Sequence, residues 1–116
     1  MNLSGYQELA LRTAAPALET SLSPQEMRLL NAALGLSGES GEFTDIVKKV
    51  ICHGHPYTKD LQDRLIKELG DVLWYCALAA DALDIGLETV AVLNIGKLKQ
   101  RYPEGFSQER SLHREA

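Results

Sequence analysis

The chain has 116 residues, and 12 Lys and Arg against 16 Asp and Glu give it a formal net charge of −4. This length suits one domain with a small core, and the charge argues against a nucleic-acid-binding protein that depends on a broad basic face. No apolar run approaches the roughly 18 residues of a membrane span, and no signal peptide is recognisable. Cys52 and Cys76 are too far apart for a CxxC motif and are typical of reduced thiols. We therefore expect a soluble protein of the cytoplasm.

The patterning is helical, and the first two helices have recognisable ends. A short helix is predicted over 3–15, with Pro16 as its stop. The segment Ser23-Pro24-Gln25-Glu26 forms a capping box with proline at the first helical position. A second helix is therefore predicted to begin there and to run to about Ile51.

Three glycines lie inside this second helix, at Gly35, Gly38 and Gly41. Each weakens the helix by about 1 kcal/mol relative to alanine. We expect a continuous or slightly bent helix in which the glycines allow another backbone or a ligand to come close.

Two more helices follow a predicted loop over 52–58. Thr58 can cap a helix that runs to about Leu83, and a further helix covers about 88–102 and ends before Pro103. The polar segment 107–116 is expected to be a frayed tail. The fold class predicted for the whole chain, residues 1–116, is all-α, a bundle of four to five helices with the motif-bearing core at about 24–106.

Two acidic pairs interrupt helix faces that otherwise look apolar. Glu39 and Glu42 form one pair and Glu68 and Asp71 the other, each at positions i and i+3, so both carboxylates of a pair point the same way. Burying an unpaired carboxylate is costly, and four facing one another would repel. A divalent cation is the simplest partner, and oxygen ligands favour Mg²⁺ or Mn²⁺ over zinc.

The last long helix carries the opposite charge. Asn94, Lys97 and Arg101 are spaced i, i+3 and i+7 and share one face, which Tyr102 follows. Cations near a carboxylate–metal cluster are what a polyphosphate requires. A solvated face at a helix end is the alternative, and the acidic pairs make it the less favoured interpretation.

Two smaller groups of residues are open to a binding interpretation. Trp74 could stack on a nucleobase, although a tryptophan on so apolar a helix is more often a core residue. Cys52, His53 and His55 look like part of a zinc site, but a fourth ligand is absent, so a polar loop is favoured.

Taken together, the ExxE of 39–42, the ExxD of 68–71 and the segment NIGKLKQRYP of 94–103 resemble the MazG-like all-α nucleoside triphosphate pyrophosphohydrolases. The resemblance covers roughly Met27 to Phe106. It implies a homodimer or homotetramer that uses Mg²⁺ to cleave a nucleoside triphosphate between the α and β phosphates. The products would be the monophosphate and pyrophosphate.

The resemblance also assigns roles by motif position. It makes metal ligands of the four acids, and it makes phosphate-binding cations of Lys97 and Arg101. Asn94 lies where the family places a polar nucleotide contact, and Arg64 matches an often basic position. Glu42 and Glu68 are the candidate catalytic residues, with Glu42 expected to take the proton from water.

Two alternatives remain open. One is a sibling of the same superfamily, a dUTP-specific hydrolase or a phosphoribosyl-ATP pyrophosphohydrolase. The other is a non-enzymatic helical dimerisation module whose acids are structural or bind a metal passively. The ordered set of four acids and two cations argues against the module, and the RYP of 101–103 and the short length favour the MazG-like branch.

Overall fold

The computed structural model describes residues 1–16 and 18–114, and every regular element in these residues is an α-helix. The helices in chain order are α1 (Leu3–Leu11), α2 (Pro24–His53), α3 (Lys59–Ala82), α4 (Leu87–Arg101) and α5 (Gln108–Leu112). Over these described ranges, β-pairing is limited to one isolated bridge between Pro103 and Gly105. The predicted all-α class is therefore confirmed. No helix of the described chain is long and apolar enough to cross a membrane.

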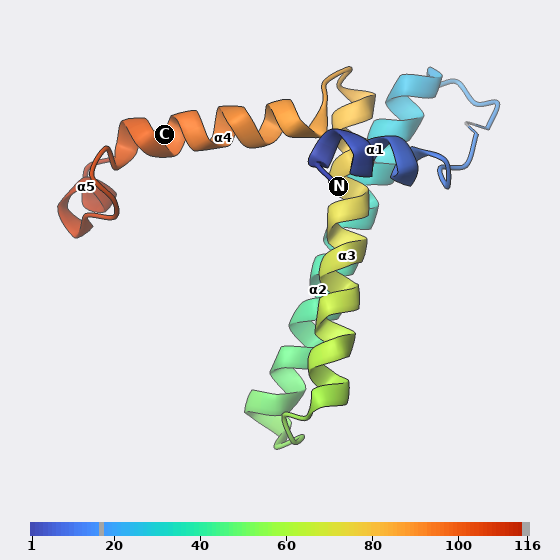
Figure 1. The fold of residues 1–116 in the computed structure, drawn as a ribbon. Helices are drawn as coiled ribbons and strands as arrows, with labels where there is room; N and C mark the ends of the chain where they lie inside the picture. The colour runs from blue at the N-terminus through green and yellow to red at the C-terminus, as the bar shows by residue number, and fades with distance from the viewer. Residues whose placement is uncertain (17, 115–116) are drawn as a thin grey trace.

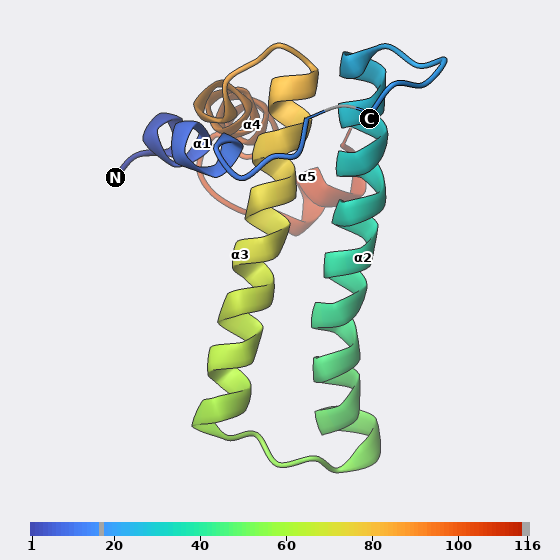
Figure 2. The same ribbon diagram turned by 90° about the vertical axis from the view of Figure 1, so that its right-hand side faces the viewer.

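Helices α2 and α3 form a long antiparallel hairpin (Figure 2). α2 begins at the predicted capping box, where the Ser23 hydroxyl accepts a hydrogen bond from the Glu26 N–H and the Glu26 carboxylate accepts one from the Ser23 N–H. α3 begins at Thr58, whose hydroxyl accepts a hydrogen bond from the Leu61 N–H. Both predicted helix starts are confirmed, and α2 continues unbroken past its three internal glycines.

The end of the first helix differs from the prediction. The sequence predicts a helix as far as Ala15, but α1 ends at Leu11. The Thr13 hydroxyl donates to the Ala10 carbonyl at 2.7 Å and accepts from the Trp74 indole N–H at 2.8 Å. The hydrogen bond from Trp74 on α3 therefore holds the segment after Leu11, where the sequence predicts a further helical turn.

Two other boundaries also differ. The predicted loop start at Cys52 is wrong, because α2 continues through His53. Gly54 caps the helix, and its φ of 71° is a left-handed conformation that favours glycine. The segment predicted as a frayed tail contains the short helix α5. Ser107 caps it, since its hydroxyl accepts a hydrogen bond from the Arg110 N–H.

Helix α4 projects away from the hairpin and is anchored at one end (Figure 1). The Gln7 side chain accepts a hydrogen bond from the Leu87 N–H at 2.9 Å and donates one to the Ala77 carbonyl at 3.2 Å. Leu87 also packs with Ala10 and Ala77 in a small apolar cluster. Every residue from 92 to 100 is exposed. The first turn of α4 is thus fixed by α1 and α3, while the rest extends into solvent.

The single chain buries few side chains. In its described part, nine apolar residues are buried, five of them alanines, and no polar or charged residue is. The nine are Ala10, Ala32, Ile46, Leu61, Ala77, Leu78, Ala80, Ala82 and Leu87. The acids of the two pairs therefore lie at the surface of the hairpin or only partly below it.

Candidate metal centre

The register between α2 and α3 is set where Gly35 faces the ring of Tyr75. A Cβ atom on Gly35 would lie 2.1 Å from Cε1 of that ring, so a side chain there has no room. The close neighbour at this position is a side chain, whereas the sequence predicts the approach of a backbone or a ligand. Along α2 the acids follow Gly35 by about one and two turns, and along α3 they precede Tyr75 by the same steps. The acids placed opposite one another in this way are Glu39 and Glu42 on α2 and Asp71 and Glu68 on α3.

Three of the four predicted metal ligands meet. Glu39, Glu42 and Glu68 each offer one carboxylate oxygen, and these oxygens lie within 4.8 Å of one another. Glu39 and Glu68 are half-buried, whereas Glu42 is exposed. The Oε2 atoms of Glu39 and Glu68 are both buried without a hydrogen-bond partner. A buried acceptor left unpaired costs about 1–3 kcal/mol, and more when it carries charge.

The pKa of Glu68 shows the effect of the neighbouring carboxylates. Burial raises the pKa of the Glu68 carboxyl above its usual range, and its interactions with Glu39 raise that pKa further. Its interaction with Glu42 lowers the pKa, and the negative charge of Asp71 again raises it. Desolvation and like charge both disfavour the ionised form, so this carboxylate needs a compensating cation.

The residues present fit a divalent cation. Mg²⁺ prefers oxygen ligands, and a set of carboxylates on one side of the ion leaves coordination positions for water or phosphate. A cation here would give the two unpaired Oε2 atoms a partner and would relieve the repulsion that raises the pKa of Glu68. In the described part of the chain, this is the one group of His, Cys, Asp and Glu side chains with ligand atoms close enough to share an ion.

Asp71 lies beside this group and is exposed. Together with Glu39, Trp74 and Tyr75 it borders a concavity on the surface of the hairpin. The half-buried Trp74 packs edge-on against Tyr75, with ring centroids 4.9 Å apart. An aromatic surface therefore adjoins the acids. The metal role of Asp71 and the base-stacking role of Trp74 stay predictions.

A second concavity adjoins the other side of the carboxylate group. Arg64 borders it together with Glu42 and Glu68, so the predicted basic residue lies next to the acids. Gly38 and Gly41 also line it, and a Cβ atom on either glycine would meet no atom within 4 Å. This flank of the acidic group is open in the single chain.

The predicted phosphate-binding residues lie elsewhere. Asn94 and Lys97 are exposed on the projecting part of α4, and Arg101 and Tyr102 are half-buried at its end. The Tyr102 ring packs on Phe106, with ring centroids 5.5 Å apart. Because α4 points away from the hairpin that carries the acids (Figure 1), one chain does not bring these residues to the carboxylates. Their roles in binding substrate stay predictions.

Comparison with known proteins gives this arrangement a context. The profile of the MazG nucleotide pyrophosphohydrolase domain matches residues 28–106, a span that contains both acidic pairs and α4. The chain belongs to this family. It is similar to the Gene 37 protein of Mycobacterium phage L5, with 42% identity over 76 residues that make up 65% of this chain and 67% of that protein. No solved structure matches the chain. Membership of the MazG family supports nucleotide pyrophosphohydrolase activity in general.

One residue that interacts with the acidic pairs belongs to none of the sequence motifs. Tyr6 lies on α1, before the matched span. Burial raises the pKa of the Tyr6 hydroxyl, and the negative charge of Asp71 raises it further. The two residues are far apart along the chain, and the packing of α1 on α3 brings their helices together, so residue spacing cannot reveal this interaction.

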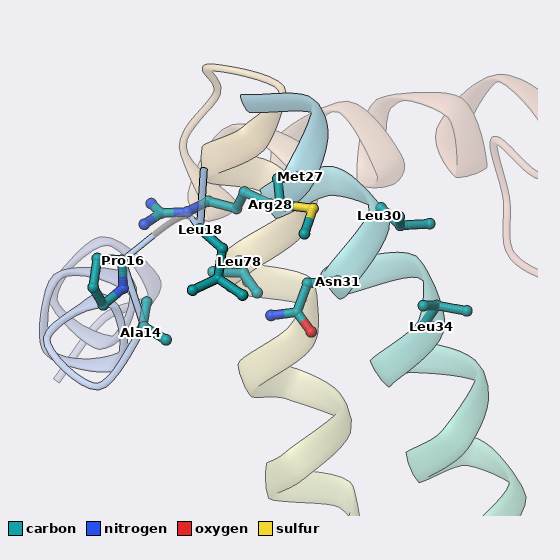
Figure 3. Close-up of a pocket in the computed structure, with 10 residues that line it drawn as sticks. Ala14, Pro16, Leu18, Met27, Arg28, Leu30, Asn31, Leu34 and Leu78 are labelled. Carbon is teal, nitrogen blue, oxygen red and sulfur yellow. The ribbon is translucent and has the colours of Figure 1, made fainter. Parts of the chain in front are cut away.

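An apolar groove lies apart from the MazG carboxylates, between the segment after α1 and the start of α2 (Figure 3). It encloses about 300 Å³, and Leu18, Met27 and Leu78 gather at its centre. No described residue that lines it is acidic, so it is not the metal centre. Figure 3 also shows that Leu30 and Leu34 point away from this centre, toward the open side of α2.

Proposed function

We propose that this MazG-family protein hydrolyses nucleoside triphosphates between the α and β phosphates, with Mg²⁺ as the metal and Mn²⁺ as a possible substitute. The observation that carries the proposal is the group of three carboxylate oxygens within 4.8 Å of one another, next to two buried oxygens without partners. A divalent cation held by these carboxylates would give the unpaired oxygens a partner. The family supplies the reaction class.

In this proposal the four acids Glu39, Glu42, Glu68 and Asp71 hold the metal. A bound divalent cation would neutralise charge on the phosphate oxygens and lower the pKa of the attacking water. Glu68 and Glu39 supply the partly buried carboxylates, which are rigidly placed because they lie on packed helices. Asp71 extends the acidic surface toward Trp74, where a nucleobase can stack.

Glu42 is the proposed general base because it is the exposed member of the carboxylate group. As the water oxygen bonds to the α-phosphorus, the bond from that phosphorus to the bridging oxygen breaks and pyrophosphate leaves. Glu42 accepts the proton from the water. Lys97 and Arg101 neutralise the departing β and γ phosphates, with Arg64 as a further cation beside the acids.

The remaining proposed contacts hold the nucleoside. Trp74 offers an aromatic face, and Asn94 and Tyr102 offer hydrogen-bonding groups. We place the activity in the upkeep of a cytoplasmic nucleotide pool.

The test is release of pyrophosphate from a panel of nucleoside triphosphates with Mg²⁺ and with a chelator. The panel includes dUTP and phosphoribosyl-ATP, the substrates of the sibling enzymes. We expect magnesium-dependent formation of monophosphate and pyrophosphate from at least one standard or modified triphosphate. Turnover of dUTP alone or of phosphoribosyl-ATP alone would assign the protein to a sibling activity. Inactivity across the panel would overturn the proposal in favour of a non-enzymatic helical module.

A further inference from the structure

The segment that follows α1 holds the side chain of Trp74 on α3. The Thr13 hydroxyl accepts a hydrogen bond from the Trp74 indole N–H at 2.8 Å and donates one to the Ala10 carbonyl at 2.7 Å. A hydroxyl has one proton to donate, and an indole N–H can only donate. The protons of both groups are therefore engaged, and the indole is tied through Thr13 to the backbone of the last turn of α1.

Helix α1 is itself fixed on α3, so this tie leads to a rigid support. The Gln7 side chain donates to the Ala77 carbonyl at 3.2 Å and accepts from the Leu87 N–H at 2.9 Å. Ala10 and Ala77 belong to one buried apolar cluster, and Trp74 packs against it. The position of Thr13 relative to α3 is therefore set by several contacts besides its own hydrogen bond.

The indole forms one wall of the concavity beside the acids. Trp74 and Tyr75 border this concavity together with Glu39 and Asp71, and it encloses about 310 Å³. The planes of the two rings lie at 84° to each other, so the rings form a corner. Tyr75 is confined by its contact with Gly35, where no room remains for a methyl group. Each aromatic wall is thus held from outside the concavity, Tyr75 by Gly35 and Trp74 by the end of α1.

The hydrogen bond to Thr13 also decides what Trp74 can offer a ligand. Its indole N–H is already donated, so the ring presents a π surface and no hydrogen-bonding group. Every nucleobase has a π face that can stack on such a surface. The strength of an aromatic contact depends on the relative orientation of the two rings. The group that fixes the orientation of Trp74 therefore controls how well a base can stack there.

We propose that Thr13 is a positioning residue, whose hydroxyl holds the Trp74 ring as the wall of a nucleobase subsite in this concavity. The inference rests on the proposed function, which supplies the nucleotide. Thr13 lies outside residues 28–106, the span that matches the family. The base subsite of this protein thus depends on a residue that the family domain does not include.

The test compares three variants. Thr13→Val replaces the hydroxyl with a methyl group at nearly constant shape and removes the acceptor of the indole N–H. The Ala10 carbonyl keeps the backbone N–H of residue 13 at 3.0 Å, so the variant leaves this carbonyl paired. Thr13→Ser keeps the hydroxyl and should behave as wild type. Thr20→Val is the matched control, because it loses a hydroxyl that accepts from the Leu22 N–H at 3.1 Å and does not border the concavity.

The first readout is the fluorescence of the ligand-free protein. The chain has one tryptophan, so the signal reports Trp74 alone. In Thr13→Val we expect faster local rotation of the indole in anisotropy decay and stronger quenching by acrylamide, with Thr13→Ser and Thr20→Val unchanged. Indole motion that is the same in Thr13→Val as in wild type would refute the anchoring role. Loss of helices in the circular dichroism of Thr13→Val would show that the hydroxyl is structural, which also refutes it.

The second readout is calorimetric affinity for ligands with and without a base. The probes, each with Mg²⁺, are the α,β-imido analogues of a purine and a pyrimidine nucleoside triphosphate, and inorganic tripolyphosphate. Thr13→Val should raise the dissociation constant of the tighter analogue about two- to tenfold, the factor that one hydrogen bond is worth. Tripolyphosphate has no base, so its affinity should not change. Equal weakening of both kinds of ligand would indicate a general structural effect and contradict the inference.

A double-mutant cycle shows whether Thr13 acts through Trp74. Trp74→Phe keeps an aromatic ring and lacks the N–H, so adding Thr13→Val to it should not weaken the analogue further. A full effect of Thr13→Val in that background would contradict the inference, as would a wild type that binds tripolyphosphate as tightly as either analogue. A wild type that turns over no triphosphate, yet binds an analogue in a Thr13-dependent way, would contradict only the proposed reaction.

Discussion

Gly35 of α2 and the ring of Tyr75 on α3 occupy one contact that leaves no space for a methyl group. A Cβ atom on Gly35 would lie 2.1–2.3 Å from three atoms of the ring. The acids lie whole turns away from this contact on both helices, so the contact aligns the two acidic pairs. A glycine that weakens the helix locally therefore positions the carboxylates.

Gly35→Ala should destabilise the protein. Alanine favours the helix by about 1 kcal/mol, but inserting a methyl group into a packed contact costs about 1–3 kcal/mol. We expect a net loss of up to about 2 kcal/mol in the free energy of unfolding, measured by urea denaturation, together with weaker activity because the helices must separate. Gly70→Ala is the matched control, since its added Cβ would meet nothing within 4 Å and should stabilise the helix. Equal stability of the two variants would contradict the packing argument.

Local signals in the sequence predict several helix ends correctly. The capping box at Ser23 and the Thr58 cap act through side-chain hydrogen bonds to residues three positions on, so they are readable from adjacent residues. The end of α1 cannot be predicted from adjacent residues, because it depends on a hydrogen bond between Thr13 and Trp74, which lie 61 residues apart.

In the site, too, local features could be predicted from the sequence and features that depend on distant contacts could not. The i, i+3 spacing predicts that the carboxylates of a pair share a face, and the structure brings three of the four acids together. That Asp71 lies at the edge follows from how α2 and α3 pack against each other. The direction of α4 could not be predicted either, since it depends on the contacts of Gln7 with Leu87 and Ala77.

Magnesium should raise the melting temperature of the wild-type protein. The carboxylates repel one another without metal, and a ligand that binds only the folded state stabilises it by about 2.7 kcal/mol at a hundred times its dissociation constant. Glu68→Gln removes one repelling charge at nearly constant shape. We expect this variant to be at least as stable as wild type in chelator, to respond little to Mg²⁺ and to be almost inactive. A destabilised variant that still responds to magnesium would refute the metal assignment.

The metal-free protein should also depend on pH through Glu68. The folded-state pKa of this carboxyl is raised, so its ionised form disfavours folding at pH values above that pKa. The penalty disappears as the pH falls through the raised pKa and below the unfolded value. In chelator, the stability advantage of Glu68→Gln over wild type should therefore shrink on acidification. Melts at several pH values measure it, and an advantage that grows as the pH falls would have the wrong sign.

Lys97→Ala and Arg101→Ala should weaken catalysis on triphosphates without unfolding the protein. Neither residue is buried, so the substitutions leave the small core intact. Loss of one charge-assisted hydrogen bond is worth about 1.5–3 kcal/mol, or roughly ten- to a hundred-fold in kcat/KM. Lys99→Ala removes the same charge from a different face of α4 and should have a much smaller effect. Full activity in both Lys97→Ala and Arg101→Ala would rule out their phosphate-binding role.

Hydrolysis in ¹⁸O-labelled water tests the central claim most directly. A triphosphate that the protein turns over is incubated with Mg²⁺, and the products are examined by mass spectrometry, with Glu68→Gln and chelator as controls. Attack of water on the α-phosphorus predicts one ¹⁸O atom in the nucleoside monophosphate, none in the pyrophosphate, and almost no reaction in either control. Nucleoside diphosphate and inorganic phosphate as products, or label in the pyrophosphate, would contradict the proposed reaction at these carboxylates.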